Sequence, residues 1–156
     1  MISTSPTLHA TAVLIGPKAV LIRGPSGSGK SSLALGLIQA ASAGSTLPFA
    51  RLVGDDRVHV DAASGRLLVR PAPALTGLIE IRGLGIRRLP HEPVAVIGLV
   101  VDLAAADAER LPARDAAETT ISGVKMPRLA VAPGQNPLPL VLAWLGTALG
   151  VTPAAN

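Results

Sequence analysis

Short apolar segments bounded by turn signals make up much of the first half of the chain. Thr11–Ile15 and Lys18–Arg23 are rich in β-branched and aliphatic residues, and the Gly-Pro pair between them favours a turn. Val58–Asp61 and Arg66–Val69 flank a Ser-Gly pair in the same way. The pattern therefore predicts two β-hairpins.

Longer apolar periodicities predict two helices and one long strand. Lys30–Ala41 places two leucines and two alanines on one stripe at helical spacing, and Leu138–Leu149 forms a second apolar helical run. Val94–Leu103 is almost entirely aliphatic and predicts a buried strand, whereas Ala104–Ala117 contains a proline and is expected to be irregular. Shorter strands are predicted at Arg51–Asp56, Thr119–Ile121 and Leu129–Val131.

Many short strands with only two helices favour an α/β fold with a mixed sheet over a doubly wound one. The 156 residues suffice for one domain of ordinary size, and 49% of them are hydrophobic while 15% are charged. The chain shows no internal repeat and no linker. Residues 1–156 are therefore expected to form a single domain with a packed core.

Composition argues against several classes of protein. The absence of cysteine removes disulfides and thiolate metal sites and fits a reducing cytosol. Phe49 and Trp144 are too few aromatic residues to stack single-stranded nucleic acid, and a net charge of +4 is a small basic excess. The longest apolar stretch, Pro137–Val151, is shorter than the ~20 residues of a spanning helix. The N-terminus lacks the basic and apolar regions of a secretory signal. We expect a cytoplasmic protein without nucleic-acid or membrane partners.

A phosphate-binding loop is the strongest chemical motif. It matches the pattern G-x-x-x-x-G-K-[ST] in full and lies between a predicted strand and a predicted helix. Its glycines let backbone N–H groups curl around phosphate oxygens, and the helix adds its positive end. Lys30 is expected to reach the β- and γ-phosphates, and Ser31 to ligate magnesium. The eight residues are Gly24, Pro25, Ser26, Gly27, Ser28, Gly29, Lys30 and Ser31.

Two acidic positions are candidates for metal binding and proton transfer. Asp55 and Asp56 end a predicted strand, where alternation sends the two carboxylates in different directions. One carboxylate can then face a metal while the other faces an acceptor hydroxyl; a turn or helix cap is the alternative. Glu80 and Arg82 interrupt an aliphatic run and share a strand face. Either they form an internal ion pair, or Glu80 binds magnesium and Arg82 binds phosphate.

These motifs occur in an order that resembles the HPr kinase/phosphorylase family. His9, Gly24–Ser31, Asp55–Val58 and Leu78–Ile86 carry the resemblance, and the Glu-Ile-Arg-Gly-Leu-Gly segment is its most specific part. The chain is similar to the C-terminal catalytic domain of that family from about Leu8 to about Leu145. The separate N-terminal domain of long members is expected to be absent.

The resemblance implies a phosphate-loop fold similar to the nucleotide core of phosphoenolpyruvate carboxykinase, assembled as a homo-oligomer, usually a hexamer. It implies a kinase that uses ATP and Mg²⁺ to phosphorylate a serine of HPr, the carrier protein of the sugar phosphotransferase system. It also implies the reverse reaction, in which inorganic phosphate removes the phosphoryl group and releases pyrophosphate.

The resemblance also implies roles for particular residues. By position, Lys30 and Ser31 contact phosphate and metal, Glu80 is a second metal contact, and the Asp55-Asp56 pair holds the general base. His9 assists at the phosphates, and Arg110 resembles the catalytic arginine of the family.

The sequence departs from the family pattern at two places. The segment that follows Ile86 is short, and neutral Gln135 stands where members carry an arginine that is associated with dephosphorylation. We therefore expect a protein that acts mainly or only as a kinase.

Two other functions stay open at this point: a kinase for a small molecule, and a regulatory module that senses nucleotide without transfer. The carboxylates favour catalysis, because a pure sensor needs only the phosphate loop.

Overall fold

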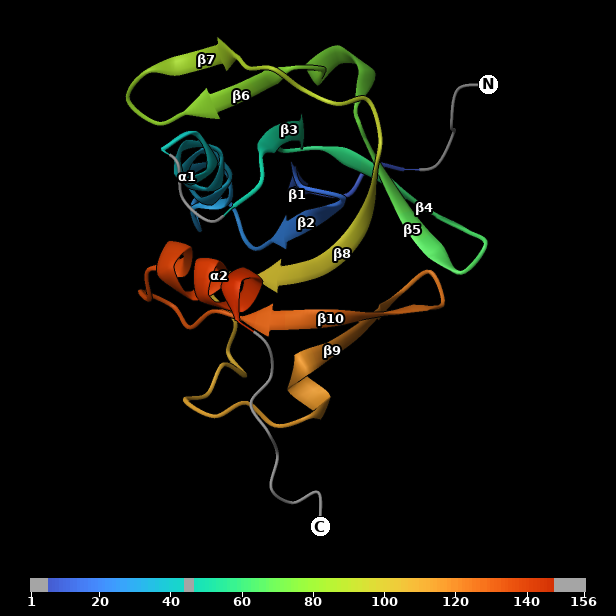
Figure 1. The fold of residues 1–156 in the computed structure, drawn as a ribbon, viewed down its shortest axis with the longest axis vertical. Coiled ribbons are helices and arrows are strands. Elements are labelled where there is room, and N and C mark those ends of the chain that lie inside the picture. The colour runs from blue at the N-terminus through green and yellow to red at the C-terminus, as the bar shows by residue number, and fades with distance from the viewer. Residues whose placement is uncertain (1–5, 44–46, 148–156) are drawn as a thin grey trace.

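The computed structural model describes residues 6–43 and 47–147. Its centre is a curved mixed sheet, and the helices α1 (Lys30–Ser42) and α2 (Pro137–Gly146) lie next to one another beside it (Figure 1). None of the described helices is long and apolar enough to span a membrane.

The main sheet runs in the order β3-β1-β2-β8-β10-β9. β2 and β10 pair parallel to β8, whereas the β1–β2, β1–β3 and β9–β10 pairs are antiparallel. The predicted mixed sheet is thus confirmed. The bounds of these strands are β1 Ala10–Ile15, β2 Lys18–Arg23, β3 Ala50–Gly54, β8 Ala95–Asp102, β9 Glu118–Ile121 and β10 Val124–Ala130.

Both predicted hairpins are present. In the second, β4 (Val58–Ala63) and β5 (Arg66–Pro71) are joined by Ser64 and Gly65, whose φ angles of 53° and 77° suit a two-residue turn between twisted strands. β5 also pairs antiparallel with the start of β8, which attaches this hairpin to the main sheet.

A third hairpin was not predicted. β6 (Leu78–Ile81) and β7 (Gly85–Arg88) form a separate two-stranded sheet beyond α1 and β3 (Figure 1). Glu80 and Arg82 are both exposed, although they interrupt an aliphatic run. Alternation turns Ile79 into the core instead, where it is 1% exposed.

Strand alternation fills two apolar cores. Val20 and Ile22 of β2 belong to the core that includes α1 and α2, while Ala19 and Leu21 belong to the core beneath the β4–β5 hairpin. Leu33 and Leu37 of the predicted helical stripe are fully buried in the first of these cores. The phosphate loop is therefore held between a buried strand and a helix with a buried face.

The remaining elements are close to the expectations. β10 is longer than the predicted strand, and the expected irregular segment contains only the short 3₁₀ turn η2 (Asp115–Ala117); a second such turn is η1 (Pro73–Leu75). Asn136 caps α2 by accepting a hydrogen bond from the Leu138 N–H. The predicted end of this helix, Leu149, lies outside the described residues.

Candidate active site

The predicted phosphate loop connects the end of β2 to the first residue of α1. Gly27 and Gly29 have φ angles of 79° and 101°, which residues other than glycine rarely adopt. No atom lies within 4 Å of a Cβ built on Gly29, so its backbone conformation, rather than lack of space, requires glycine there. The free N–H groups at the start of α1 face the loop and form a site for anions.

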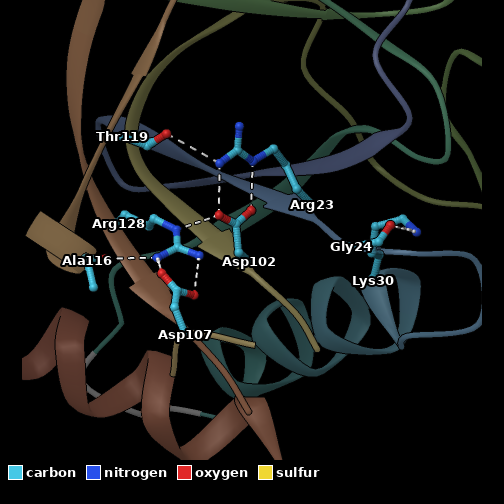
Figure 2. Close-up of polar contacts among 8 residues, drawn as sticks. All are labelled: Arg23, Gly24, Lys30, Asp102, Asp107, Ala116, Thr119 and Arg128. Carbon is cyan, nitrogen blue, oxygen red and sulfur yellow. Dashed lines mark hydrogen bonds and ion pairs between the residues drawn. The ribbon is translucent and has the colours of Figure 1, made fainter. Parts of the chain in front are cut away.

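Lys30 lies inside this loop. It is 6% exposed, and its Nζ donates hydrogen bonds to the carbonyl oxygens of Gly24 at 2.9 Å (Figure 2) and Pro25 at 3.1 Å. Burial lowers the pKa of Lys30, and the nearby carboxylates of Asp56 and Asp55 offset part of this effect. The backbone of the loop thus surrounds the ammonium group of Lys30.

Asp55 is the buried member of the acidic pair. It follows β3, is 3% exposed, and accepts hydrogen bonds from Thr11 Oγ1 at 2.8 Å, Ser31 Oγ at 2.6 Å and the Glu80 N–H at 3.0 Å. The carboxylate therefore joins β1, α1, β3 and β6. Thr11 had not been recognised from the sequence, because a lone buried threonine in a strand carries no motif.

Asp56 is the exposed member of the pair. Its backbone is left-handed, with a φ of 69°, and its Oδ1 lies 2.9 Å from His9 Nε2, a partner that it does not share with Asp55. The side chains of His9 and Asp56 are 35% and 59% exposed. The prediction that the two carboxylates point in different directions is thus confirmed.

One cavity of about 530 Å³ brings together most of the predicted site residues. Glu80 contributes a carboxylate to it, and Arg82 reaches over the loop, where an Nη atom lies 3.8 Å from the position of a Cβ built on Gly27. No ion pair joins Glu80 to Arg82 in the part of the chain that is described, so the internal-pair interpretation is not supported. The polar residues that line this cavity are His9, Thr11, Ser26, Lys30, Ser31, Ser32, Asp56, Glu80 and Arg82.

Comparisons with known proteins identify the family to which the chain belongs. The family profile described as "HPr Serine kinase C-terminal domain" matches residues 1–144. The chain belongs to this family. It is 33% identical to an HPr kinase/phosphorylase of Geobacillus thermodenitrificans, over 86% of this chain and 45% of that protein. It is 42% identical to an HPr kinase/phosphorylase of Mycoplasma mycoides, over 53% of this chain and 24% of that protein.

A solved structure shows the same fold. The HPr(Ser) kinase/phosphatase of Coxiella burnetii superimposes with a TM-score of 0.70 at 24% identity, covering 91% of this chain and 94% of the other. The expected phosphate-loop fold of the HPr kinase family is thereby confirmed. The chain spans less than half the length of the curated relatives given above.

Two predicted residues of this HPr kinase family domain lie elsewhere. Arg110 is exposed in the segment after β8 and does not line the 530 Å³ cavity. Gln135 lines a second cavity of about 340 Å³, where its Oε1 accepts a hydrogen bond from the Ala132 N–H. The structure therefore groups His9, Lys30, Ser31, Asp56 and Glu80, with Asp55 directly behind them.

Sequence reasoning missed an ion-pair network at the ends of β2, β8 and β10. Asp102 accepts hydrogen bonds from Arg23 at 2.7 and 2.8 Å and from Arg128 at 2.6 Å, and Arg128 also binds both oxygens of Asp107 (Figure 2). Arg23 also donates to the Thr119 hydroxyl. The sequence shows that Arg23 and Asp102 end apolar strands, but it does not show that these strand ends are neighbours.

Proposed function

We propose that this domain is an ATP- and Mg²⁺-dependent serine protein kinase that acts on HPr or a related carrier protein. One observation carries the proposal: the 530 Å³ cavity joins the phosphate loop to a His9–Asp56 pair whose carboxylate is exposed. Family membership supports HPr as the acceptor. The cavity thus offers a phosphate site and a proton acceptor side by side.

The loop supplies the binding of the triphosphate. Backbone N–H groups of the loop and of the first turn of α1 donate to phosphate oxygens. In this proposal the Lys30 ammonium, which donates hydrogen bonds to two loop carbonyls, exchanges these partners for the β- and γ-phosphates. Arg82, which reaches over Gly27, adds a planar cation from the β6–β7 hairpin.

The donor set fits a magnesium ion that is shared with the nucleotide. Ser31 Oγ, the Asp55 carboxylate and Glu80 are oxygen donors, the type that Mg²⁺ prefers. No group of three acidic or histidine side chains is arranged to hold a metal alone within residues 6–43 and 47–147. This agrees with an ion that depends on substrate phosphates, as Mg²⁺ commonly does in phosphoryl transfer. When bound, such an ion neutralises charge on the transferring phosphoryl group.

Asp56 is the better general base of the two aspartates. Asp55 already accepts three hydrogen bonds, so its protonation would break hydrogen bonds inside the fold. Asp56 is open to the cavity, and His9 orients it. In the forward reaction Asp56 takes the proton of the acceptor serine. The serine oxygen bonds to the γ-phosphorus, and ADP leaves. Phosphorolysis is a separate reaction, in which inorganic phosphate attacks the phosphorus of phosphoserine. The bond between phosphorus and the serine oxygen breaks, Asp56 returns a proton to that oxygen, and pyrophosphate forms.

Transfer of label from γ-labelled ATP to a purified HPr-type carrier tests the proposal. We expect labelled phosphoserine only in the presence of Mg²⁺. Binding of ATP without transfer would favour the nucleotide-sensing module instead, and transfer to small molecules but not to the carrier would favour a small-molecule kinase. We also propose a homo-oligomer, which light scattering tests separately.

A further inference from the structure

Thr11 is a buried polar residue next to the two aspartates of the candidate site. It lies on β1, is 0% exposed, and borders the 530 Å³ cavity. A hydroxyl group is costly to bury unless it is hydrogen-bonded. The partners of the Thr11 hydroxyl therefore indicate what this residue does.

The Thr11 hydroxyl binds both aspartates at once. Its Oγ1 donates a hydrogen bond to Asp55 Oδ1 at 2.8 Å and accepts one from the Asp56 N–H at 3.4 Å. An ionised carboxylate can only accept and a backbone N–H can only donate, so the direction of each bond is fixed. A single oxygen atom thus joins the buried carboxylate to the backbone of the exposed aspartate.

The chain forms a very tight turn at Asp56. The Arg57 N–H donates to Asp55 O at 2.7 Å, and the φ of Asp56 between them is 69°. A turn closed over three residues with a positive φ at its centre is the rare and strained form of the γ-turn. Strained backbone persists where the surrounding structure holds it in place. This turn therefore depends on contacts from neighbouring elements.

The start of β1 supplies these contacts. The backbone pairing of β1 with β3 ends at Ala12 and Gly54, directly before the turn. Beyond that point side chains take over: Thr11 binds the Asp56 N–H, and His9 lies 2.9 Å from the Asp56 carboxylate. Two residues of one segment thus hold the two ends of Asp56.

We propose that Thr11 is a positioning residue for phosphoryl transfer, whose hydroxyl fixes the Asp55-Asp56 turn so that the Asp56 carboxylate stays beside His9 in the cavity. This inference rests on the proposed function, which makes Asp56 the proton acceptor. Among the described residues, the Thr11 side chain forms no hydrogen bond with Lys30 or with the backbone of the phosphate loop. Loss of the hydroxyl should therefore slow transfer without weakening nucleotide binding.

Two substitutions separate the hydroxyl from the shape of the side chain. Thr11→Val keeps the branched shape and removes the hydroxyl, whereas Thr11→Ser keeps the hydroxyl and removes the methyl group. Thr11→Ala is a second variant without a hydroxyl, for use if the valine variant does not fold. Val13→Ala is the control for a general loss of stability, since Val13 is buried on the same strand and does not line the cavity.

Three measurements are compared: steady-state transfer to the carrier, calorimetric titration with Mg-ATP, and hydrogen exchange of the Asp56 amide followed by NMR. We expect Thr11→Val to lower kcat by ~10-fold or more, because a misplaced catalytic group reduces the rate strongly, and to leave the Kd of Mg-ATP within ~2-fold. Exchange of the Asp56 amide should become ~10-fold faster relative to the amides of β2, since this N–H loses its acceptor. Thr11→Ser should stay close to the wild type in all three measurements.

An unchanged kcat or an unchanged exchange rate in the hydroxyl-free variant would overturn the inference. It would also be overturned if Thr11→Ser were as slow as Thr11→Val, if Val13→Ala lost as much kcat, or if the Kd of Mg-ATP rose as much as kcat fell. Absence of transfer by the wild-type protein would instead reject the proposed function. The exchange measurement needs no substrate, so it decides in either case whether Thr11 holds the backbone of Asp56.

Discussion

Asp55 and Asp56 are neighbours in the chain and have opposite surroundings. Asp55 is buried and binds three donors from other elements, whereas Asp56 is exposed and its carboxylate lies against the ring of His9. This difference follows from the left-handed backbone of Asp56, which turns its carboxylate towards the cavity. The proposed function accordingly assigns a structural and metal-side role to Asp55 and a proton-transfer role to Asp56.

Replacement of Asp56 by Asn should leave the Kd of Mg-ATP unchanged and lower phosphoryl transfer by ~10²-fold or more, the usual effect of losing a positioned base. Steady-state transfer to the carrier measures this. Glu118→Gln, which neutralises an exposed carboxylate on β9, is the control. Wild-type turnover in the Asp56 variant would reject the assignment of the base.

Asp55→Asn should behave differently, since an amide cannot accept all three hydrogen bonds in the present geometry. We expect a loss of about 1–3 kcal/mol in the free energy of unfolding, together with lower activity. Urea unfolding followed by circular dichroism measures the loss. A fully stable variant would mean that these donors find other partners.

Lys30→Ala should abolish or strongly weaken ATP binding, because it removes the cation that faces the β- and γ-phosphates. Calorimetric titration with Mg-ATP measures the effect, and thermal unfolding checks that the variant is folded. Unchanged affinity in a folded variant would contradict the phosphate-loop assignment.

At the scale of elements, the sequence was most informative where turns and apolar periodicity agree. The hairpins at the Gly-Pro and Ser-Gly pairs and the helix that begins at Lys30 are all present. The N-terminal part of β10 was not predicted, because Lys125 and Pro127 break the apolar pattern. Pro127 is accommodated where β10 changes its partner from β9 to β8.

For the candidate site too, local sequence patterns were informative and contacts between distant residues were not predicted. Motifs that are continuous in the sequence predicted the phosphate loop, the Asp55-Asp56 pair and Glu80. The cavity brings the loop, Asp56 and Glu80 together, and Asp55 binds Ser31 and the Glu80 N–H behind it. Contacts between distant residues, such as Arg23 with Asp102, depend on the order of the strands, which no local pattern encodes. The placement of Arg110 as a catalytic residue rests on resemblance alone and stays a prediction.

The network at the strand ends makes stability depend on pH. Burial raises the pKa of Asp102, but the hydrogen bonds and charges of Arg23 and Arg128 outweigh burial and lower this pKa below its ordinary value of 3.8. Folding therefore gains stability from ionised Asp102 above that value and loses it as the pH falls through the lower folded pKa. The hydrogen bond from Arg128 lowers the pKa of exposed Asp107 in the same direction.

We expect the free energy of unfolding to fall between about pH 5 and pH 2 in the wild type, and less steeply in Asp102→Asn. At pH 7 this variant should be less stable by about 2 kcal/mol, since two guanidinium groups lose charged acceptors. Urea titrations across this pH range measure both effects. Parallel pH profiles for the two proteins would contradict the role of Asp102.

At the scale of the whole molecule, the phosphate loop separates two cavities, and Gln135 lies in the cavity without charges. Phosphorolysis brings inorganic phosphate next to a phosphoserine, so two anions must be held by fixed cations. In the proposed function the kinase direction needs fewer cations, because Lys30 and the loop amides are the groups assigned to the γ-phosphate. The domain should therefore act mainly or only as a kinase.

Gln135→Arg should raise the phosphate-dependent release of pyrophosphate from the phosphorylated carrier. The measurement compares pyrophosphate release at millimolar phosphate with forward transfer in both proteins. Arginine cannot accept the hydrogen bond that the Ala132 N–H donates to Gln135. The matched control is Gln135→Lys, because lysine loses the same acceptor and adds a positive charge but has no planar guanidinium group. Brisk wild-type phosphorolysis, comparable to the forward rate, would contradict the prediction.

The two carbonyl bonds of Lys30 also bear on how quickly a nucleotide is captured. The ammonium ties the carbonyls of Gly24 and Pro25 together, so contacts within the chain itself fix the curved backbone of the loop. Capture then requires an exchange of partners at one nitrogen rather than the folding of a disordered segment. Association should accordingly approach the rate of diffusional encounter, and deuterium uptake by the loop amides should already be slow before any ligand arrives.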